Sequence, residues 1–177
     1  MQPATVRSSS SSLSSYPPDT GRHRTVEAVR WWVKVAGTGQ AAYTQERWDE
    51  RRRRMSSGAT GPSLFPKRPR IEHGNRLVVY ASGSAGEYGE GRFVAIEEVV
   101  SHEPEPSGHE RWRWRLETRL LAAVDEIARA PAVREIGVSP KSLRQHSHIG
   151  LTDEQGERAI ELLRVAGGRL ELPTSRL

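Results

Sequence analysis

The spacing of apolar residues along the chain predicts a core made mainly of strands. Residues 25–37 are rich in Val and Trp and end at a glycine, which is typical of a buried strand. Residues 76–82 and 92–100 have the β-branched and aromatic content of two more strands, and the glycine-rich turn between them predicts an antiparallel hairpin. Residues 111–117 alternate Arg and Trp, the period of a strand with one buried and one solvated face.

Two segments have the composition of helices. Residues 44–55 contain good helix formers throughout, and their basic end, residues 51–54, would lie at the negative pole of the helix dipole. Nearer the C-terminus, Thr152 stands three residues before Gln155, which is the spacing of a capping box. We expect the helix that begins there to end at Gly167, since glycine tolerates the left-handed conformation best.

The other segments are loops or have a weaker pattern. The Ser- and Pro-rich residues 1–25 predict a disordered tail, and residues 26–177 are expected to form a single domain. Residues 56–75 are dense in Gly, Pro and Ser and predict a long loop, and residues 102–110 predict a second one. Residues 120–136 are apolar enough for a strand that runs into a short helix beginning at a proline.

The composition excludes several classes of protein. The chain of 177 residues has no cysteine, which excludes a disulfide framework, a cysteine-based zinc site and a thiol nucleophile. No apolar run approaches eighteen residues, and the N-terminus lacks the pattern of a secretory signal. We therefore expect a cytoplasmic protein without a membrane partner.

The glycine-rich turn at residues 83–91 could be mistaken for a phosphate-binding loop. It lacks the Gly-Lys-Ser or Gly-Lys-Thr ending of such loops, and a strand follows it where a phosphate loop would open a helix. The sequence therefore argues against a nucleotide-binding P-loop.

The basic residues are concentrated in the N-terminal part of the chain. The net charge is +5, which divides into +8 for residues 1–70 and −3 for residues 71–177. A basic segment attracts a polyanion by counterion release, so nucleic acid is a reasonable partner. However, 24 of the 27 basic residues are Arg, a bias that a high-GC genome would also produce.

Two histidines, His146 and His148, stand one residue apart ahead of the C-terminal helix. In an extended segment they would face one side, while Gln145 and Ser147 would face the other. Two imidazoles on one face can share a metal, but such a site needs a third ligand, and no motif ties another histidine to this segment. The amide and hydroxyl groups, with the guanidinium of Arg144, suit the edge of a planar polar ligand such as a base. They could equally satisfy backbone groups near the helix start.

Several short motifs follow one another in a familiar order. They are "RWWVKVAG", "GNRLVVYASG", "GRFVAIEEVV", an "RW" strand and "SLRQHSHIGLTDEQGERAI". This order resembles the EVE domain, a member of the PUA-like superfamily related to the YTH domain. The likeness covers about residues 28–166.

The resemblance implies an α/β (α+β) fold, in which a PUA-like strongly curved mixed β-sheet or small barrel is flanked by helices. It also implies a non-catalytic module that binds one modified nucleobase of DNA or RNA in an aromatic-lined pocket, with no cofactor and no catalytic residue. Protein partners are not indicated. By this likeness the pocket is surrounded by Trp31, Trp32, Lys34, Tyr80, Ser82, Arg144, Gln145, Ser147 and His148, with Trp112 and Trp114 as supporting residues.

The tryptophans also have a structural interpretation. Trp31 and Trp32 are adjacent and point to opposite faces of a strand, so at most one of them lines a given pocket. Trp112 and Trp114 would share a face and are expected to anchor the sheet.

Two other functional classes stay open. A metal-dependent nucleotide or nucleic-acid hydrolase could use His146 and His148 with a carboxylate such as Asp153 or Glu154. An interaction domain could use the long loops to contact a protein partner.

Overall fold

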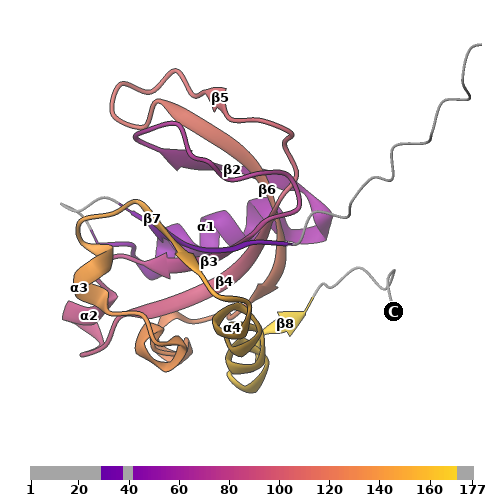
Figure 1. The fold of residues 1–177 in the computed structure, drawn as a ribbon. Helices are drawn as coiled ribbons and strands as arrows, with labels where there is room; N and C mark the ends of the chain where they lie inside the picture. The colour runs from indigo at the N-terminus through magenta and orange to yellow at the C-terminus, as the bar shows by residue number, and fades with distance from the viewer. Residues whose placement is uncertain (1–28, 38–41, 171–177) are drawn as a thin grey trace, which may run out of the picture.

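The structure is a computed structural model that describes residues 29–37 and 42–170, so the predicted disordered tail lies outside the described residues. In the described part, eight strands form one mixed sheet in the order β2-β6-β4-β3-β1-β7, and the short strands β5 and β8 pair with β6. Among the strands of the described residues, β1 and β3 form the one parallel pair. Figure 1 shows the sheet curling strongly into a half-barrel, which confirms the predicted curved mixed sheet. The strands are β1 (Trp31–Ala36), β2 (Thr60–Phe65), β3 (Arg76–Ala81), β4 (Arg92–Val99), β5 (Glu105–Pro106), β6 (Trp114–Ala123), β7 (His148–Leu151) and β8 (Arg169–Leu170).

Helices flank the sheet, as predicted. The longer two are α1 (Gln45–Met55), which packs against β2 and β6, and α4 (Asp153–Val165), which packs against β1, β4 and β6. Two single turns, α2 (Ser84–Glu87) and α3 (Pro140–Leu143), lie in connections between strands. Across residues 29–37 and 42–170, no helix has the length and apolar character needed to span a membrane.

Both long helices begin at a threonine cap. The Thr44 hydroxyl accepts a hydrogen bond from the backbone N–H of Arg47 at 3.4 Å. At α4 the bonds are reciprocal, because the Thr152 hydroxyl accepts from the Gln155 N–H at 3.2 Å and the Gln155 side chain accepts from the Thr152 N–H at 3.0 Å. The capping box predicted from the spacing is therefore present. Past the end of α4, Gly167 has a φ of 80°, the left-handed conformation expected there.

Alternation along β1 separates the two faces of the sheet. Trp31 is 3% exposed and lies against α4, with Gly156 directly beneath its indole. Trp32 points to the opposite face, which we name the inner face, and packs with Phe65 of β2 in a smaller apolar cluster. Lys34, two residues further on, shares this inner face with Trp32. Lys34, which lines the candidate site described below, therefore lies on the inner face.

The close contact between Trp31 and Gly156 makes a testable prediction. A Cβ added at Gly156 would stand 2.1 Å from the indole. Such overpacking should cost about 3 kcal/mol, and the helix propensity of alanine offsets only about 1 kcal/mol of that cost. Gly156→Ala should therefore lower the free energy of unfolding by about 2 kcal/mol. Thermal unfolding followed by circular dichroism measures the change. Gly86→Ala is the matched control, since nothing lies within 4 Å of the Cβ it would gain. Equal stability of wild type and Gly156→Ala would contradict this packing.

The prediction of one long loop over residues 56–75 is wrong. Its middle forms β2, which pairs antiparallel with β6 along its whole length. The sequence pattern does not predict this strand, because Gly61 and Pro62 are residue types that are rare inside strands. Proline is tolerated here because β2 is an edge strand in the observed order.

The segment around β6 also differs from its prediction. The strand begins at Trp114 and continues to Ala123, so the apolar residues 120–123 are its end and not part of another strand. Alternation persists along it, since Leu116, Thr118 and Leu120 are all buried. Two 3-10 turns follow where a short helix was predicted, and a two-residue strand, β5, interrupts the predicted loop at residues 102–110.

Candidate ligand-binding site

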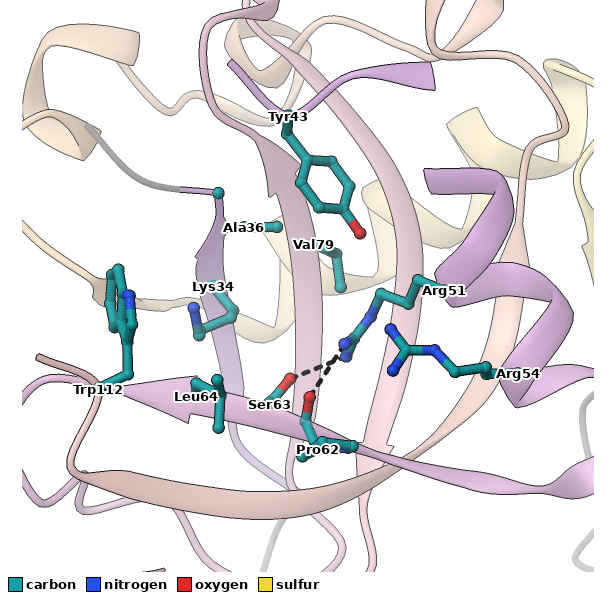
Figure 2. A pocket seen from close by; sticks show the side chains of 11 residues that line it. Lys34, Ala36, Tyr43, Arg51, Arg54, Pro62, Ser63, Leu64, Val79 and Trp112 are labelled. Carbon is teal, nitrogen blue, oxygen red and sulfur yellow. Dashed lines mark hydrogen bonds between the residues drawn. The ribbon is translucent and has the colours of Figure 1, made fainter. Parts of the chain in front are cut away.

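A small cavity of about 270 Å³, which we name the Lys34 cavity, lies between β1, β2 and α1. Figure 2 shows its side chains converging from segments that are far apart in the sequence. Lys34 comes from β1, Ser63 and Leu64 from β2, and Trp112 from the segment before β6. The remaining walls are Ala36, Gly37, Tyr43, Arg51, Arg54, Pro62 and Val79.

A buried ion pair lies behind this cavity. Glu97 of β4 is 0% exposed, and Arg51 of α1 binds both of its carboxylate oxygens, with Nε–Oε1 and Nη2–Oε2 distances of 2.8 and 2.7 Å. The hydroxyls of Thr118 and Ser63 also donate to Oε2, at 2.8 and 3.2 Å. Burial pushes the pKa of Glu97 upward, but the charge of Arg51 and these hydrogen bonds outweigh burial and hold the pKa below its usual value. Glu97 is therefore ionised and fully paired.

Among the described residues, Lys34 has no such partner. It is 5% exposed, and its ammonium donates a hydrogen bond to the backbone carbonyl of Val35. Its Nζ lies 5.0 Å from the ring centroid of Phe65 and 5.8 Å from that of Trp112. Burial, reinforced by the charge of Arg51 and opposed by Glu97, lowers the pKa of Lys34 to about 7. At neutral pH this amine is therefore protonated in only part of the molecules.

A larger cavity of about 710 Å³ adjoins the first and shares Gly37 and Trp112 with it. We name it the Tyr80 cavity. Its walls are the end of β1, the end of β3, the start of α2, and the segment that joins α3 to β7. Its polar and aromatic lining side chains are Tyr80, Ser82, Arg111, Trp112, Arg144, Gln145, His146 and Ser147.

Backbone hydrogen bonds hold these walls together. The Ser82 N–H donates to the carbonyl of Ala36 at 3.0 Å, and the Val35 N–H donates to the carbonyl of Ser147 at 2.9 Å. The Tyr43 N–H donates to the carbonyl of Ser82 at 2.7 Å and ties the segment ahead of the Thr44 cap to the same rim. The rim of the Tyr80 cavity is thus held in place without a ligand.

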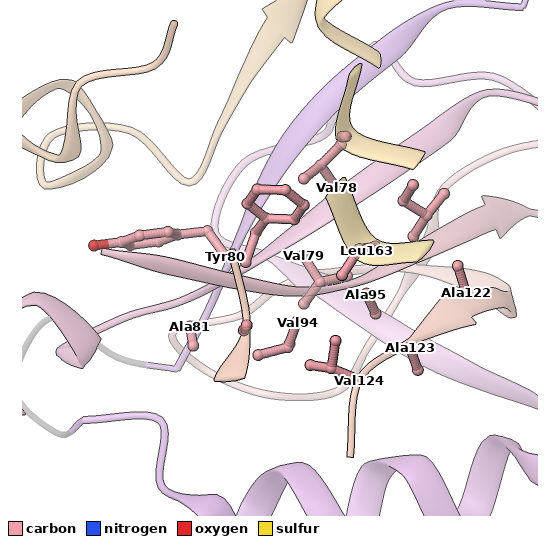
Figure 3. Packing of buried hydrophobic residues seen from close by; sticks show 14 of the residues in the cluster. Val78, Val79, Tyr80, Ala81, Val94, Ala95, Ala122, Ala123, Val124 and Leu163 are labelled. Atoms are coloured by element: carbon pink, nitrogen blue, oxygen red, sulfur yellow. The ribbon is translucent and has the colours of Figure 1, made fainter. Parts of the chain in front are cut away.

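Tyr80 and Ser82 present polar atoms at this rim. Figure 3 shows Tyr80 at the edge of the main apolar cluster, with its hydroxyl pointing away from Val78 and Val94. Gly91 leaves room for this ring, since a Cβ there would stand 2.8 Å from it. Burial raises the pKa of Tyr80, so its hydroxyl keeps its proton. The buried Ser82 hydroxyl has no hydrogen-bond partner among the described residues.

The two cavities share a charge pattern. Cationic side chains line both of them, and no Asp or Glu lies among their described lining residues. Arg51 is neutralised by Glu97, but Lys34, Arg54 and Arg144 make no ion pair within the described part of the chain. Such a lining attracts ligands that carry negative charge or hydrogen-bond acceptors.

Six of the nine predicted pocket residues line one of these cavities. Tyr80, Ser82, Arg144, Gln145 and Ser147 meet in the Tyr80 cavity, although they come from two distant segments. Lys34 lines the neighbouring Lys34 cavity.

The other three predicted residues lie elsewhere. Trp31 is packed in the core against α4, as described above. Trp32 is half-buried on the inner face, where its indole N–H donates to Asn75 Oδ1 at 3.2 Å. His148 lies beside Trp32 and Phe65, with ring centroids 5.6 and 5.4 Å apart, and burial lowers its pKa. None of these three side chains lines either cavity.

Trp112 was expected to anchor the sheet together with Trp114, but the two residues differ. Trp114 packs against the smaller apolar cluster of the inner face and lies under the guanidinium of Arg68. Trp112 precedes β6 and forms a wall of both cavities. The tryptophan that lines the site is therefore Trp112, and not Trp31 or Trp32 of the first strand.

The prediction that His146 and His148 share a face is wrong. Strand β7 begins only at His148, so the preceding residues do not follow the alternation of a strand. His146 lines the Tyr80 cavity together with Gln145 and Ser147, whereas His148 turns toward the inner face. Within residues 29–37 and 42–170, no three His, Asp or Glu side chains are grouped closely enough to hold a metal ion.

Sequence reasoning missed Tyr43, Arg51, Arg54 and Glu97. The basic run in α1 was interpreted as a complement to the helix dipole, and Arg53 does face solvent and bond the Asp49 carbonyl. Arg51 instead turns inward to a carboxylate 46 positions away in the sequence. No local pattern marks that pairing.

Comparisons with known proteins find only distant similarity. No family model matches the chain, and no curated protein matches it. Two solved structures are similar over most of their length. Rpa0253 from Rhodopseudomonas palustris is 14% identical with a TM-score of 0.45, over 77% of this chain and 94% of that one. Atu2648 from Agrobacterium tumefaciens is 17% identical with a TM-score of 0.45, over 82% of this chain and 97% of that one. At this level of similarity neither a family nor a function is assigned.

Proposed function

We propose that this chain is a non-catalytic, EVE-like binding module that takes up one modified base of DNA or RNA in the Tyr80 cavity. The observation that carries the proposal is the joint character of the two cavities, which are walled by aromatic rings and lined by cations without a described carboxylate. The volume of about 710 Å³ falls within the roughly 300–1,000 Å³ typical of small-molecule sites. A cytoplasmic location, where nucleic acid is at hand, is part of the proposal.

The lining side chains fit the chemistry of a base turned out of its strand. A base has two π-faces, and stacking on an aromatic side chain contributes about 1–3 kcal/mol. Trp112 is half-buried and offers such a face, with the Arg111 guanidinium 5.4 Å from its ring centroid. Arg144, Gln145 and Ser82 supply donors and acceptors for the base edge. The ring and the edge of one base can therefore be recognised together.

Titration of single-stranded oligonucleotides, each with one modified or unmodified base, tests this proposal by tryptophan fluorescence. We expect a modified base to bind more tightly than its unmodified parent at physiological salt. Trp112→Ala should weaken that binding by about 5- to 150-fold, the equivalent of one lost stacking contact.

Trp114→Ala is the matched control, because Trp114 is a half-buried indole two residues away that lines neither cavity. Circular dichroism of both variants checks that they are folded. Equal affinity for every oligonucleotide, abolished by salt, would reject base recognition.

A further inference from the structure

We propose that the Lys34 cavity is an anion-binding site that receives a carboxylate or phosphate group of the ligand whose ring occupies the Tyr80 cavity. The identity of that ring rests on the proposed function, whereas the anion site stands on the unpaired cations described next. The anionic group can come from an acidic substituent on the base or from the phosphate of a nucleotide. Both sources present the same chemistry, anionic oxygens close to a planar ring.

Two of the three cationic side chains that line this cavity, Lys34 and Arg54, have no anionic partner among the described residues. Lys34 is 5% exposed, and the described residues place no carboxylate within 4 Å of its ammonium. Arg54, which also lines the cavity, makes no ion pair in the same residues. Burying an ammonium group is costly unless it is paired, and its contacts with Phe65 and Trp112 compensate only in part. An anion would provide the missing partner.

The neighbouring carboxylate cannot take that role. Both oxygens of Glu97 are bonded by Arg51, and one of them also accepts from Ser63 and Thr118. Glu97 is also fully buried and does not line the cavity, and Arg51 offsets its charge. An incoming anion would therefore meet Lys34 and Arg54 without a competing carboxylate.

Size and position connect this cavity to the larger one. Its volume of about 270 Å³ lies below the range of sites that hold a complete small molecule, but it suffices for one anionic group. Trp112 and Gly37 belong to both cavities. A ring stacked on Trp112 would thus place a substituent at the entrance of the Lys34 cavity. Figure 2 shows the Lys34 side chain next to the Trp112 indole.

Protonation of Lys34 should report the anion directly. The charged and titratable groups around Lys34 are Tyr43, Arg51 and Arg54 from α1 and its start, Glu97 from β4, and His148 from β7. Without a ligand, burial holds the pKa of Lys34 at about 7. A bound anion favours the charged ammonium, so it should raise that pKa and the protein should take up protons near neutral pH.

The chain is well suited to this measurement because it contains only three lysines, Lys34, Lys67 and Lys141. Protein labelled with ¹³C and ¹⁵N on lysine gives one side-chain signal for each, and Lys67 and Lys141 are exposed internal controls. We would record pH titrations with and without inorganic phosphate, using sodium chloride at equal ionic strength to correct for screening. We expect phosphate to raise the Lys34 midpoint by about one pH unit and to leave the other two nearly unchanged.

Three further probes identify the source of the anion. They are cytidine 5′-monophosphate, 5-carboxycytidine and unmodified cytidine. A shift of the Lys34 midpoint by the monophosphate alone assigns the site to a phosphate, and a shift by the carboxylated nucleoside alone assigns it to a base substituent. Neutral cytidine should leave the midpoint in place.

A matched pair of variants tests the role of the second cation. In Arg54→Gln, about tenfold more phosphate should be needed for the same shift of the Lys34 midpoint, as expected for a lost hydrogen bond to a charged group. Arg53→Gln should not, because Arg53 is exposed on the same helix, as Arg54 is, but does not line the cavity.

The proposal is overturned if none of the anionic probes moves the Lys34 midpoint, or if phosphate moves all three lysines equally. Failure of the base proposal would look different. In that case phosphate would still shift Lys34, but no nucleoside would perturb Trp112. Conversely, a nucleotide that perturbs Trp112 without moving Lys34 would support the base cavity and reject the anion site.

Discussion

Glu97→Gln is expected to lower the free energy of unfolding by about 3 kcal/mol, because it leaves a largely buried guanidinium without its counter-charge. Arg51 binds both carboxylate oxygens, and the side chain of Glu97 has no exposed surface. Glutamine keeps the volume but replaces one acceptor oxygen with an N–H₂ donor, which would face the N–H groups of Arg51. Chemical denaturation of the variant and the wild type measures the loss.

Glu98→Gln, one position along the same strand, is the matched control. Glu98 pairs with Arg119, but both side chains are partly exposed, so the loss should be within about 1 kcal/mol. Equal losses for the two variants would contradict the account of Glu97 as a buried, fully paired charge.

The same ion pair predicts how stability depends on acid. Arg51 and the hydrogen bonds hold the pKa of Glu97 below its usual value in the folded state. The contribution of Glu97 is therefore fully present above the ordinary carboxyl pKa and is lost as the pH falls below it toward the folded pKa. We expect the stability gap between wild type and Glu97→Gln to narrow over that acidic range.

Lys34→Met is expected to act in the opposite direction and to stabilise the protein at neutral pH. Burial lowers the pKa of Lys34 from 10.5 to about 7, and each pKa unit corresponds to about 1.4 kcal/mol. Methionine fills a similar space without a charge, and the change loses one hydrogen bond to the Val35 carbonyl, worth about 1 kcal/mol. The net gain should be about 2–4 kcal/mol.

The sign of the pH dependence is specific to this lysine. Because its pKa is lower in the folded state, the destabilisation is complete below pH about 7 and declines as the pH rises toward the unfolded value of 10.5. The gain from Lys34→Met should therefore be largest at or below neutral pH and should shrink at alkaline pH. Lys67→Met, at an exposed position, should change stability little at any pH. A gain that grows with pH would contradict the burial of an unpaired ammonium.

Such a gain would also clarify the function of Lys34. A residue that lowers stability in the absence of ligand is expected where binding, rather than folding, requires it. Lys34→Met should therefore be more stable than the wild type. It should also lose the uptake of protons that is expected when phosphate binds near neutral pH.

Local signals in the sequence predicted local structure well. The spacing of Thr152 and Gln155 predicted the cap of α4, and the glycine-rich turn between β3 and β4 predicted their hairpin. Sequence patterns failed to predict elements whose structure depends on contacts between distant segments. Pro62 is accepted in β2 because that strand lies at the edge of the sheet, and edge position cannot be read from a single segment.

The candidate site shows the same division. The resemblance in motif order pointed to Tyr80, Ser82, Arg144, Gln145 and Ser147, and the fold brings these together in one cavity. Alternation correctly placed Trp31 and Trp32 on opposite faces, but it could not tell which face opens into a cavity. The pairing of Arg51 with Glu97 and the position of Trp112 between two cavities depend on contacts between distant segments. Such contacts cannot be predicted from the periodicity of any one segment.

The indole N–H spectrum of ¹⁵N-labelled protein tests the central claim most directly. The chain has five tryptophans, so it gives five resolvable signals. On addition of an oligonucleotide with one modified base, we expect the Trp112 signal to shift strongly, while Trp31 and Trp48, which are buried in the core, keep their positions. Binding of the oligonucleotide that leaves Trp112 unmoved would contradict the placement of the base in the Tyr80 cavity.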